Sequence, residues 1–136
     1  WAPVINCVLK HKDKILVVQR SNELNFYPGY WNGISGFLDD KRSLEQKVKD
    51  ELKEELGIAS KSARKIRLGE IFHQEEAKYK KIWIVHPVLV EVSTEKVKLD
   101  WEAKNYKWIK LGEAKRLKLL PGFDRVLEKL SAWVGQ

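Results

Sequence analysis

The stretch that decides the fold is GFLDDKRSLEQKVKDELKEELGI, from Gly36 to Ile58. Ser43 is a favourable N-cap residue, and Gln46, three positions later, completes the capping-box pattern of a helix start. Gly57 provides a C-terminal stop, because glycine adopts the left-handed backbone conformation without a steric penalty. These signals predict a helix over 44–56.

The predicted helix carries an apolar stripe that is bordered by acids. At about 100° per residue, one side of the helix collects Leu44, Val48, Leu52 and Leu56 and must face the core. Glu51 and Glu55 border this stripe, and Glu54 is beside them. Like charges at this spacing repel, and partial burial makes each ionised carboxylate more costly unless a cation compensates. Lys47 or Lys53 could supply that charge. Alternatively a divalent ion could, since Mg²⁺ takes oxygen ligands and often keeps substrate phosphates in its shell.

Upstream of this helix, the sequence predicts a hairpin and then an irregular loop. In VINCVLKHKDKILVVQRS (4–21), two apolar runs surround the polar turn 11–14, which is the pattern of two antiparallel strands. Segment 22–40 is rich in Gly, Asn and aromatic residues, and its breakers exclude a long regular element.

Downstream of the helix, two more strands are predicted over 63–74 and 80–92, joined by the polar turn 75–78. Pro87 lies within the second strand. Because proline cannot donate a hydrogen bond to a neighbouring strand, we expect that strand to lie at an edge of the sheet or to be bulged.

The last third of the chain predicts one strand and two helical segments. The strand covers 104–111, a short helix or turn covers 112–120, and an amphipathic helix covers 123–134. The order of strands, helix, strands, helix indicates a single α+β domain over 1–136, with a mixed β-sheet between helices.

The composition favours anionic partners. The chain of 136 residues has 26 Lys and Arg against 19 Asp and Glu, a net charge of +7, which suits nucleotides, nucleic acids or phosphorylated metabolites. No basic stripe with interleaved aromatic residues is evident, so nucleic acid is the less favoured partner. No apolar run reaches the length of a membrane span and no secretory signal pattern is present, so we expect a cytoplasmic protein without a membrane partner. The sequence leaves the oligomeric state open, and a homodimer is one option.

The quoted stretch resembles the Nudix box. That pattern is Gly, five residues, Glu, seven residues, Arg-Glu, an apolar residue, any residue, Glu-Glu, any residue, Gly and an apolar residue. The matching positions are Gly36, Glu51, Leu52, Glu54, Glu55, Gly57 and Ile58. Two positions differ, because Arg42 stands where the pattern has Glu and Asp50 stands where it has Arg.

The resemblance extends over nearly the whole chain. ILVVQRS (15–21) is similar to the family's strand that ends in a substrate-facing Arg. YPGYWNGISG (27–36) resembles its Trp-containing loop, and WEAKNYKWIKLGEAKRL (101–117) resembles its late Glu, strand and short helix. The resemblance implies a Nudix-type α/β/α sandwich.

The family resemblance also implies the chemistry. Nudix enzymes hydrolyse the pyrophosphate linkage of a nucleoside diphosphate joined to another group, with Mg²⁺ as cofactor and Mn²⁺ as an alternative. Glu54 and Glu55 would be the leading metal ligands, Glu51 a ligand or a water-orienting base, and the Gly36 carbonyl a further ligand. Glu102 would act as a general base or metal ligand.

Two residues outside the helix are candidates for contacts with the substrate. Arg20 would bind a phosphate; the less favoured alternative is a polar strand end, since most arginines are exposed. Trp31 would stack on a base, but packing within its loop is an equal alternative. Substrate specificity is expected in the loops 22–32 and 73–81.

The two departures from the box have two interpretations. Arg42 and Asp50 could form a reversed ion pair, if the loop folds back over the helix, or they could be independent surface substitutions. Loss of the Arg beside the metal ligands could lower activity. The alternative function is therefore a catalytically impaired Nudix-like module that binds a phosphorylated ligand or RNA.

A diphosphate isomerase with the same fold is a third option, with little support. No second catalytic motif centred on a cysteine is present. Cys7, the single cysteine, lies in an apolar run, so we expect it to be a small buried hydrophobe and not a nucleophile.

Overall fold

The structure is a computed structural model that describes residues 2–134. The strands are β1 (Ala2–His11), β2 (Lys14–Arg20), β3 (Trp31–Asn32), β4 (Ile34–Phe37), β5 (Ala63–Leu68), β6 (Phe72–Glu76), β7 (Lys81–Val92) and β8 (Ala103–Ile109). The α-helices are α1 (Leu44–Leu56) and α2 (Phe123–Val134), and the short 3-10 helices are η1 (Ser60–Ser62), η2 (Ala77–Tyr79) and η3 (Leu111–Arg116).

One mixed sheet organises the chain around β1. This strand runs parallel to β7 and antiparallel to β2 and β4. Strand β2 also pairs with β3 and β8, and β7 also pairs with β5 and β6. The predicted hairpin at the start of the chain is confirmed, with Lys10 opposite Ile15 and His11 opposite Lys14.

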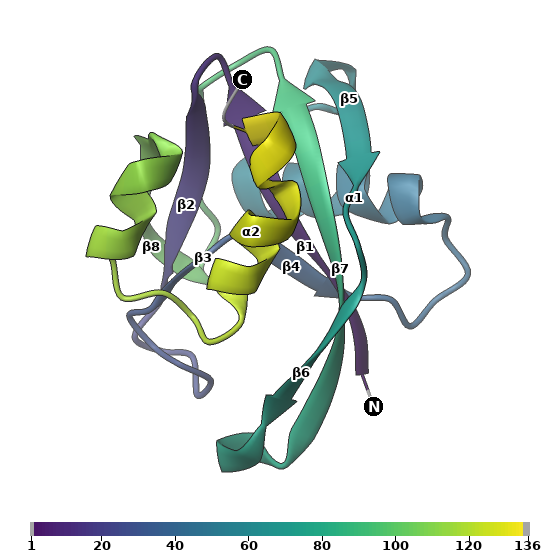
Figure 1. Cartoon of the computed structure of the whole chain (residues 1–136). Coiled ribbons are helices and arrows are strands. Elements are labelled where there is room, and N and C mark those ends of the chain that lie inside the picture. The colour runs from purple at the N-terminus through teal and green to yellow at the C-terminus, as the bar shows by residue number, and fades with distance from the viewer. Residues whose placement is uncertain (1, 135–136) are drawn as a thin grey trace.

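The two α-helices cover opposite faces of the sheet (Figure 1). Neighbouring residues of a strand point to opposite faces, so Val8 joins the core under α2 whereas Cys7 and Leu9 join the core under α1. The predicted α/β/α sandwich is thereby confirmed. Cys7 is buried, as expected, and burial raises the pKa of its thiol, which opposes formation of a nucleophilic thiolate.

Helix α1 has the predicted bounds. The Ser43 side chain accepts a hydrogen bond from the Gln46 backbone N–H, and Gly57 ends the helix with φ +66°. The side-chain amide of Gln46, which the capping box directs to the N-cap, donates instead to Asp50 Oδ1 at 2.8 Å. The helix start is therefore set by Ser43, and Gln46 takes part in a different network.

Two predictions about the later strands were wrong. The stretch 63–74 is not one strand, because β5 ends at Leu68 and β6 begins at Phe72. Strand β7 is not at an edge, because β1 lies on one side of it and β5 and β6 on the other. It is not bulged against β1 either, because their register continues through Pro87 without a shift. The Pro87 carbonyl accepts from Gly69 N–H at 2.8 Å, within the gap between β5 and β6. Since the N and O of one strand residue point to the same side, the missing N–H of Pro87 faces that gap.

The C-terminal third largely follows the prediction. The strand expected over 104–111 is β8, and the expected short helix is η3. Helix α2 packs with Phe123, Val126, Leu127 and Leu130 in the core. Within residues 2–134, no helix is long and apolar enough to cross a membrane.

Candidate active site

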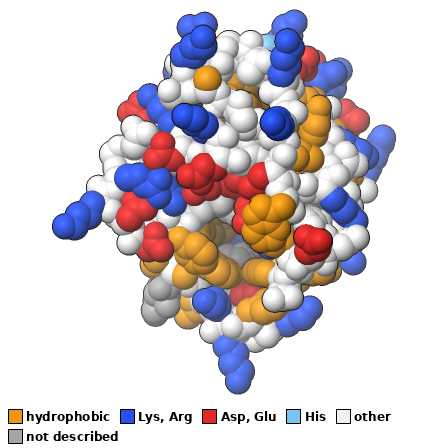
Figure 2. Space-filling view, turned by 180° about the vertical axis from the view of Figure 1, so that it is seen from behind, with side chains coloured by type: hydrophobic (Ala, Val, Ile, Leu, Met, Phe, Trp, Pro, Cys, Tyr) orange, Lys and Arg blue, Asp and Glu red, His pale blue; other side chains and the backbone are white. Residues whose placement is uncertain are grey.

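A cavity of about 810 Å³ opens beside the N-terminal half of the sheet's central strands and the C-terminal half of α1. Seven acidic residues line it, three of them on α1: Glu51, Glu54, Glu55, Asp39, Glu76, Asp100 and Glu102. Figure 2 shows this face of the molecule, where acidic side chains border a hollow that has hydrophobic side chains on its other side. The volume is within the range of small-molecule sites.

Glu55 is an acid of this cavity with a buried carboxylate oxygen that a positive charge would stabilise. Its side chain is half-buried, and its Oε2 atom is fully buried without a hydrogen-bond partner. Burial, followed by the neighbouring carboxyl groups of Glu51 and Glu102, raises the pKa of Glu55 far above its usual range. A positive ion placed at this atom would relieve both the desolvation and the repulsion.

Glu51 is held between a lysine and a glycine. Lys47 Nζ lies 3.0 Å from Glu51 Oε1, one helical turn earlier on α1. On the other side, a Cβ added at Gly36 would lie 2.8 Å from the Glu51 carboxylate. Gly36 therefore lets β4 approach the helix closely enough for its backbone to reach the acidic wall of the cavity.

Glu54, Glu102 and Arg20 complete the polar end of the cavity. Glu54 is exposed, and Glu102 is half-buried. Arg20 stands at the end of β2, and its Nε donates to the Phe26 carbonyl at 2.7 Å. Burial lowers the pKa of Arg20, whereas the charges of Glu102 and Glu55 oppose that shift. The structure thus brings a guanidinium group next to the acids.

The structure does not bring Trp31 to this cavity. Trp31 is a buried member of the core under α2, and Lys107 Nζ lies 5.2 Å from its ring centroid. Its side chain packs in the same cluster as residues of η3 and α2. Its backbone N–H donates to the Lys118 carbonyl at 2.8 Å. Of the two roles considered for Trp31, packing therefore agrees with its position and stacking on a base in this cavity does not.

Aromatic residues also line the cavity: Phe26, Phe37, Tyr79, Trp83, Trp101 and Phe123. The rings of Phe26, Phe37, Tyr79 and Trp83 contact one another and form the aromatic end of the cavity. The Phe26 and Trp83 rings stack with centroids 5.8 Å apart. Sequence reasoning selected neither Phe26 nor Trp83 as a contact for a ligand. The loops 22–32 and 73–81, which it did select, contribute Phe26 and Tyr79.

Glu76 is a further residue that sequence reasoning missed. It is only 7% exposed, yet it lines the aromatic end of the cavity. Its Oε1 accepts a hydrogen bond of 2.5 Å from the Tyr27 hydroxyl, and this bond raises the pKa of Tyr27 to about 12. A buried acceptor beside stacked rings can bind an N–H group of a ligand.

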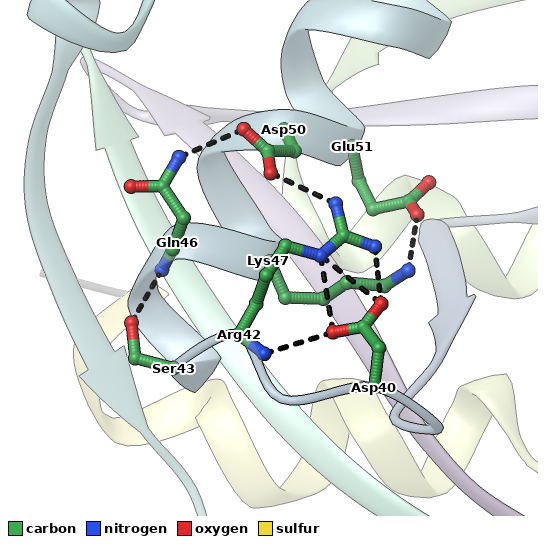
Figure 3. A network of polar contacts seen from close by, with 7 residues as sticks. All are labelled: Asp40, Arg42, Ser43, Gln46, Lys47, Asp50 and Glu51. Atoms are coloured by element: carbon green, nitrogen blue, oxygen red, sulfur yellow. Dashed lines mark hydrogen bonds and ion pairs between the residues drawn. The ribbon is translucent and has the colours of Figure 1, made fainter.

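The reversed ion pair of the degenerate box is present. Arg42 Nη1 donates to Asp50 Oδ2 at 2.8 Å, and Arg42 also binds Asp40 (Figure 3). Gln46 donates to the second oxygen of Asp50. The loop before α1 therefore folds back over the helix as the hypothesis required, and the two substitutions are not independent.

The donor set fits a hard divalent cation. Within the described part of the chain, no group of three or more His, Cys, Asp or Glu residues is already arranged to hold a metal ion. Glu51 is paired with Lys47. The buried, unpartnered Glu55 Oε2 and the adjacent carboxylates nevertheless supply the oxygen ligands that Mg²⁺ and Mn²⁺ prefer.

Several solved structures share this fold. An Ap4A hydrolase from C. elegans is 22% identical, with a TM-score of 0.76 and 98% of each chain covered. A MutT NUDIX hydrolase from Burkholderia pseudomallei is 19% identical, with a TM-score of 0.80, over 95% of this chain and 97% of that chain. A bifunctional NMN adenylyltransferase/ADP ribose pyrophosphatase from Francisella tularensis, complexed with AMP and a Mn ion, is 22% identical, with a TM-score of 0.79, over 98% of this chain and 42% of that chain.

These similarities establish the fold, and the family rests on a separate match. A comparison with curated proteins finds no match. A family model of the NUDIX domain matches residues 2–130, and that range holds the carboxylate helix and the whole lining of the cavity. The chain therefore belongs to the NUDIX domain family.

Proposed function

We propose that this chain hydrolyses the pyrophosphate linkage of a nucleoside diphosphate joined to another group, with Mg²⁺ as cofactor and Mn²⁺ as a substitute. The observation that carries the proposal is the buried, unpartnered Oε2 of Glu55 on the wall of an 810 Å³ cavity. A carboxylate in that position is costly without a cation, and the cavity beside it has room for a nucleotide.

Each polar residue at this end of the cavity has a proposed role. Glu54 and Glu55 hold the metal, with the Gly36 carbonyl as a further ligand. When bound, the metal ion neutralises phosphate charge and lowers the pKa of a coordinated water. Arg20 binds a phosphate oxygen, because its guanidinium group lies in the cavity wall. Glu102 accepts a proton from the attacking water or serves as another ligand.

The aromatic end of the cavity suits the base of the nucleotide. The stacked rings of Phe26 and Trp83 offer a flat apolar surface, and stacking of a base on an aromatic side chain is worth about 1–3 kcal/mol. The buried Glu76 carboxylate would accept a hydrogen bond from the edge of that base. The Francisella structure that holds AMP and a Mn ion supports a nucleotide and a divalent metal as ligands of this fold.

A substrate panel tests the proposal. The protein is incubated with nucleoside diphosphates linked to sugars, alcohols or a second nucleotide, with Mg²⁺ present, and released monophosphates are measured by chromatography. We expect release from at least one compound and its loss in Glu54→Gln. Glu45→Gln is the matched control, because Glu45 is also on α1 but lies outside the cavity, with its side chain 66% exposed.

The same experiment separates the enzyme from a binding module. Tight binding of a nucleotide without turnover would support the impaired module, for which the exchanged charges of Arg42 and Asp50 are the structural argument. Affinity for RNA that falls steeply with salt would support it too, since phosphate contacts dominate such binding.

A further inference from the structure

A buried lysine lies among the acids of the active site. Lys47 and Glu51 form an ion pair of 3.0 Å in which the two side chains are only 9% and 12% exposed, and both residues line the cavity (Figure 3). Lysine is rarely buried unless it is paired. The positive charge of Lys47 is therefore fixed at one of the carboxylates that the family pattern assigns to metal.

Helix geometry alone does not explain this pair. Helices favour a Glu that precedes a Lys by four residues over the reverse order, and Lys47 precedes Glu51. The pair Glu45 and Lys49 on the same helix has the favoured order and a similar distance of 3.1 Å, but Glu45 is 66% exposed. The Lys47 pair is thus held by its enclosed position, and the Lys49 pair is an ordinary surface contact.

Glu51 has little freedom to leave Lys47. The space on its other side is closed by β4, because even a Cβ at Gly36 would lie 2.8 Å from its carboxylate. Glu55, one turn further along α1, has no such cation and keeps an unpartnered buried oxygen. The two acids therefore differ in charge balance, since Glu51 is already neutralised and Glu55 is not.

We propose that Lys47 is a tethered cation that takes the place of a divalent ion at Glu51. Metal binding in the wild-type protein then depends on Glu54 and Glu55, and Glu51 contributes to it only when the ammonium group is removed. The physical reason is that an ammonium group and a divalent ion at one carboxylate repel each other at short range. This inference rests on the proposed function, because it concerns the same metal site. In that site Glu51 pairs with Lys47, whereas Glu54 and Glu55 bind the metal ion.

A titration of the full chain with Mn²⁺ tests the role of Lys47. The EPR signal of the free ion measures how much Mn²⁺ remains unbound at each step. We expect Lys47→Met to tighten Mn²⁺ binding about tenfold or more, because the repelling charge is gone. We expect Glu51→Gln to change affinity by less than about twofold in the wild-type background but to reverse most of the gain in the Lys47→Met background. Lys49→Met, the matched control, should leave the affinity unchanged.

The outcomes separate this inference from the proposed function. Equal Mn²⁺ affinity of wild type and Lys47→Met, or loss of Mn²⁺ binding in wild type on Glu51→Gln alone, would overturn the role of Lys47 while leaving the metal site intact. No Mn²⁺ binding by any variant would overturn both. Circular dichroism checks that each variant folds, and Lys47→Gln replaces Lys47→Met if the latter does not.

Discussion

Replacing Glu55 by Gln should stabilise the metal-free protein at neutral pH while removing a metal ligand. The folded protein binds the Glu55 proton more tightly than the unfolded chain does, because burial and the neighbouring carboxyl groups raise the pKa of this group above its ordinary value of 4.5. Its contribution to stability is therefore complete below the unfolded pKa and declines as pH rises above that value.

The size of this effect follows from the pH interval. At pH 7 the solution lies about 2.5 pH units above the unfolded pKa, and each unit corresponds to about 1.4 kcal/mol, so the penalty reaches at most ~3.5 kcal/mol. Water reaches the half-buried side chain and reduces this value. A glutamine has no such penalty, because it stays neutral at every pH.

Urea unfolding at pH 5 and pH 8 in the presence of EDTA measures the difference. We expect the free energy of unfolding of Glu55→Gln, relative to wild type, to rise by about 1–3 kcal/mol between the two pH values. Glu45→Gln, on an exposed part of the same helix, should show no such rise. If wild type and Glu55→Gln depend on pH in parallel, Glu55 does not carry the buried charge that the metal site requires.

Three other predictions concern the loop, the glycine and the aromatic end of the cavity. Asp50→Arg should lower the melting temperature and kcat, because two positive charges would then face each other. Adding Arg42→Glu should restore both quantities, because the pair would regain complementary charges. Failure of the double variant to recover would refute the coupling. Gly36→Ala should weaken Mn²⁺ binding, since the new methyl group would lie 2.8 Å from the Glu51 carboxylate and would push away β4, which carries the proposed Gly36 carbonyl ligand, whereas Gly112→Ala, with open space around it, should not. Tyr79→Ala should raise KM with little change in kcat, which steady-state kinetics would show; an unchanged KM would remove Tyr79 from the nucleotide site.

The local elements were readable from the sequence. The bounds of α1 follow from Ser43 and Gly57, whose effects act within one helical turn. The first hairpin follows from the polar turn between two apolar runs. The spacing of Glu51, Glu54 and Glu55 placed these acids beside the apolar stripe before any tertiary contact was known.

Tertiary pairing was not readable in the same way. The central position of β7 depends on its parallel pairing with β1, in which Ala2 lies opposite Trp83, and no local signal records a contact over that separation. No local signal distinguishes the two tryptophans either. Trp83 lines the cavity whereas Trp31 packs in the core, and only the tertiary structure decides which does which. The sequence named Lys47 and Lys53 as equal partners for the acids, and the three-dimensional structure selects Lys47.

The central claim is that the acids of α1 hold a divalent ion against a pyrophosphate. Isotope labelling tests this claim most directly. A substrate found in the panel is hydrolysed in ¹⁸O-labelled water, and the products are followed by ³¹P NMR with Mg²⁺ or with EDTA. The account predicts a phosphate product that carries ¹⁸O, formed with Mg²⁺ and lost with EDTA or in Glu55→Gln. Turnover that persists with EDTA, or at an unchanged rate in Glu55→Gln, would contradict it.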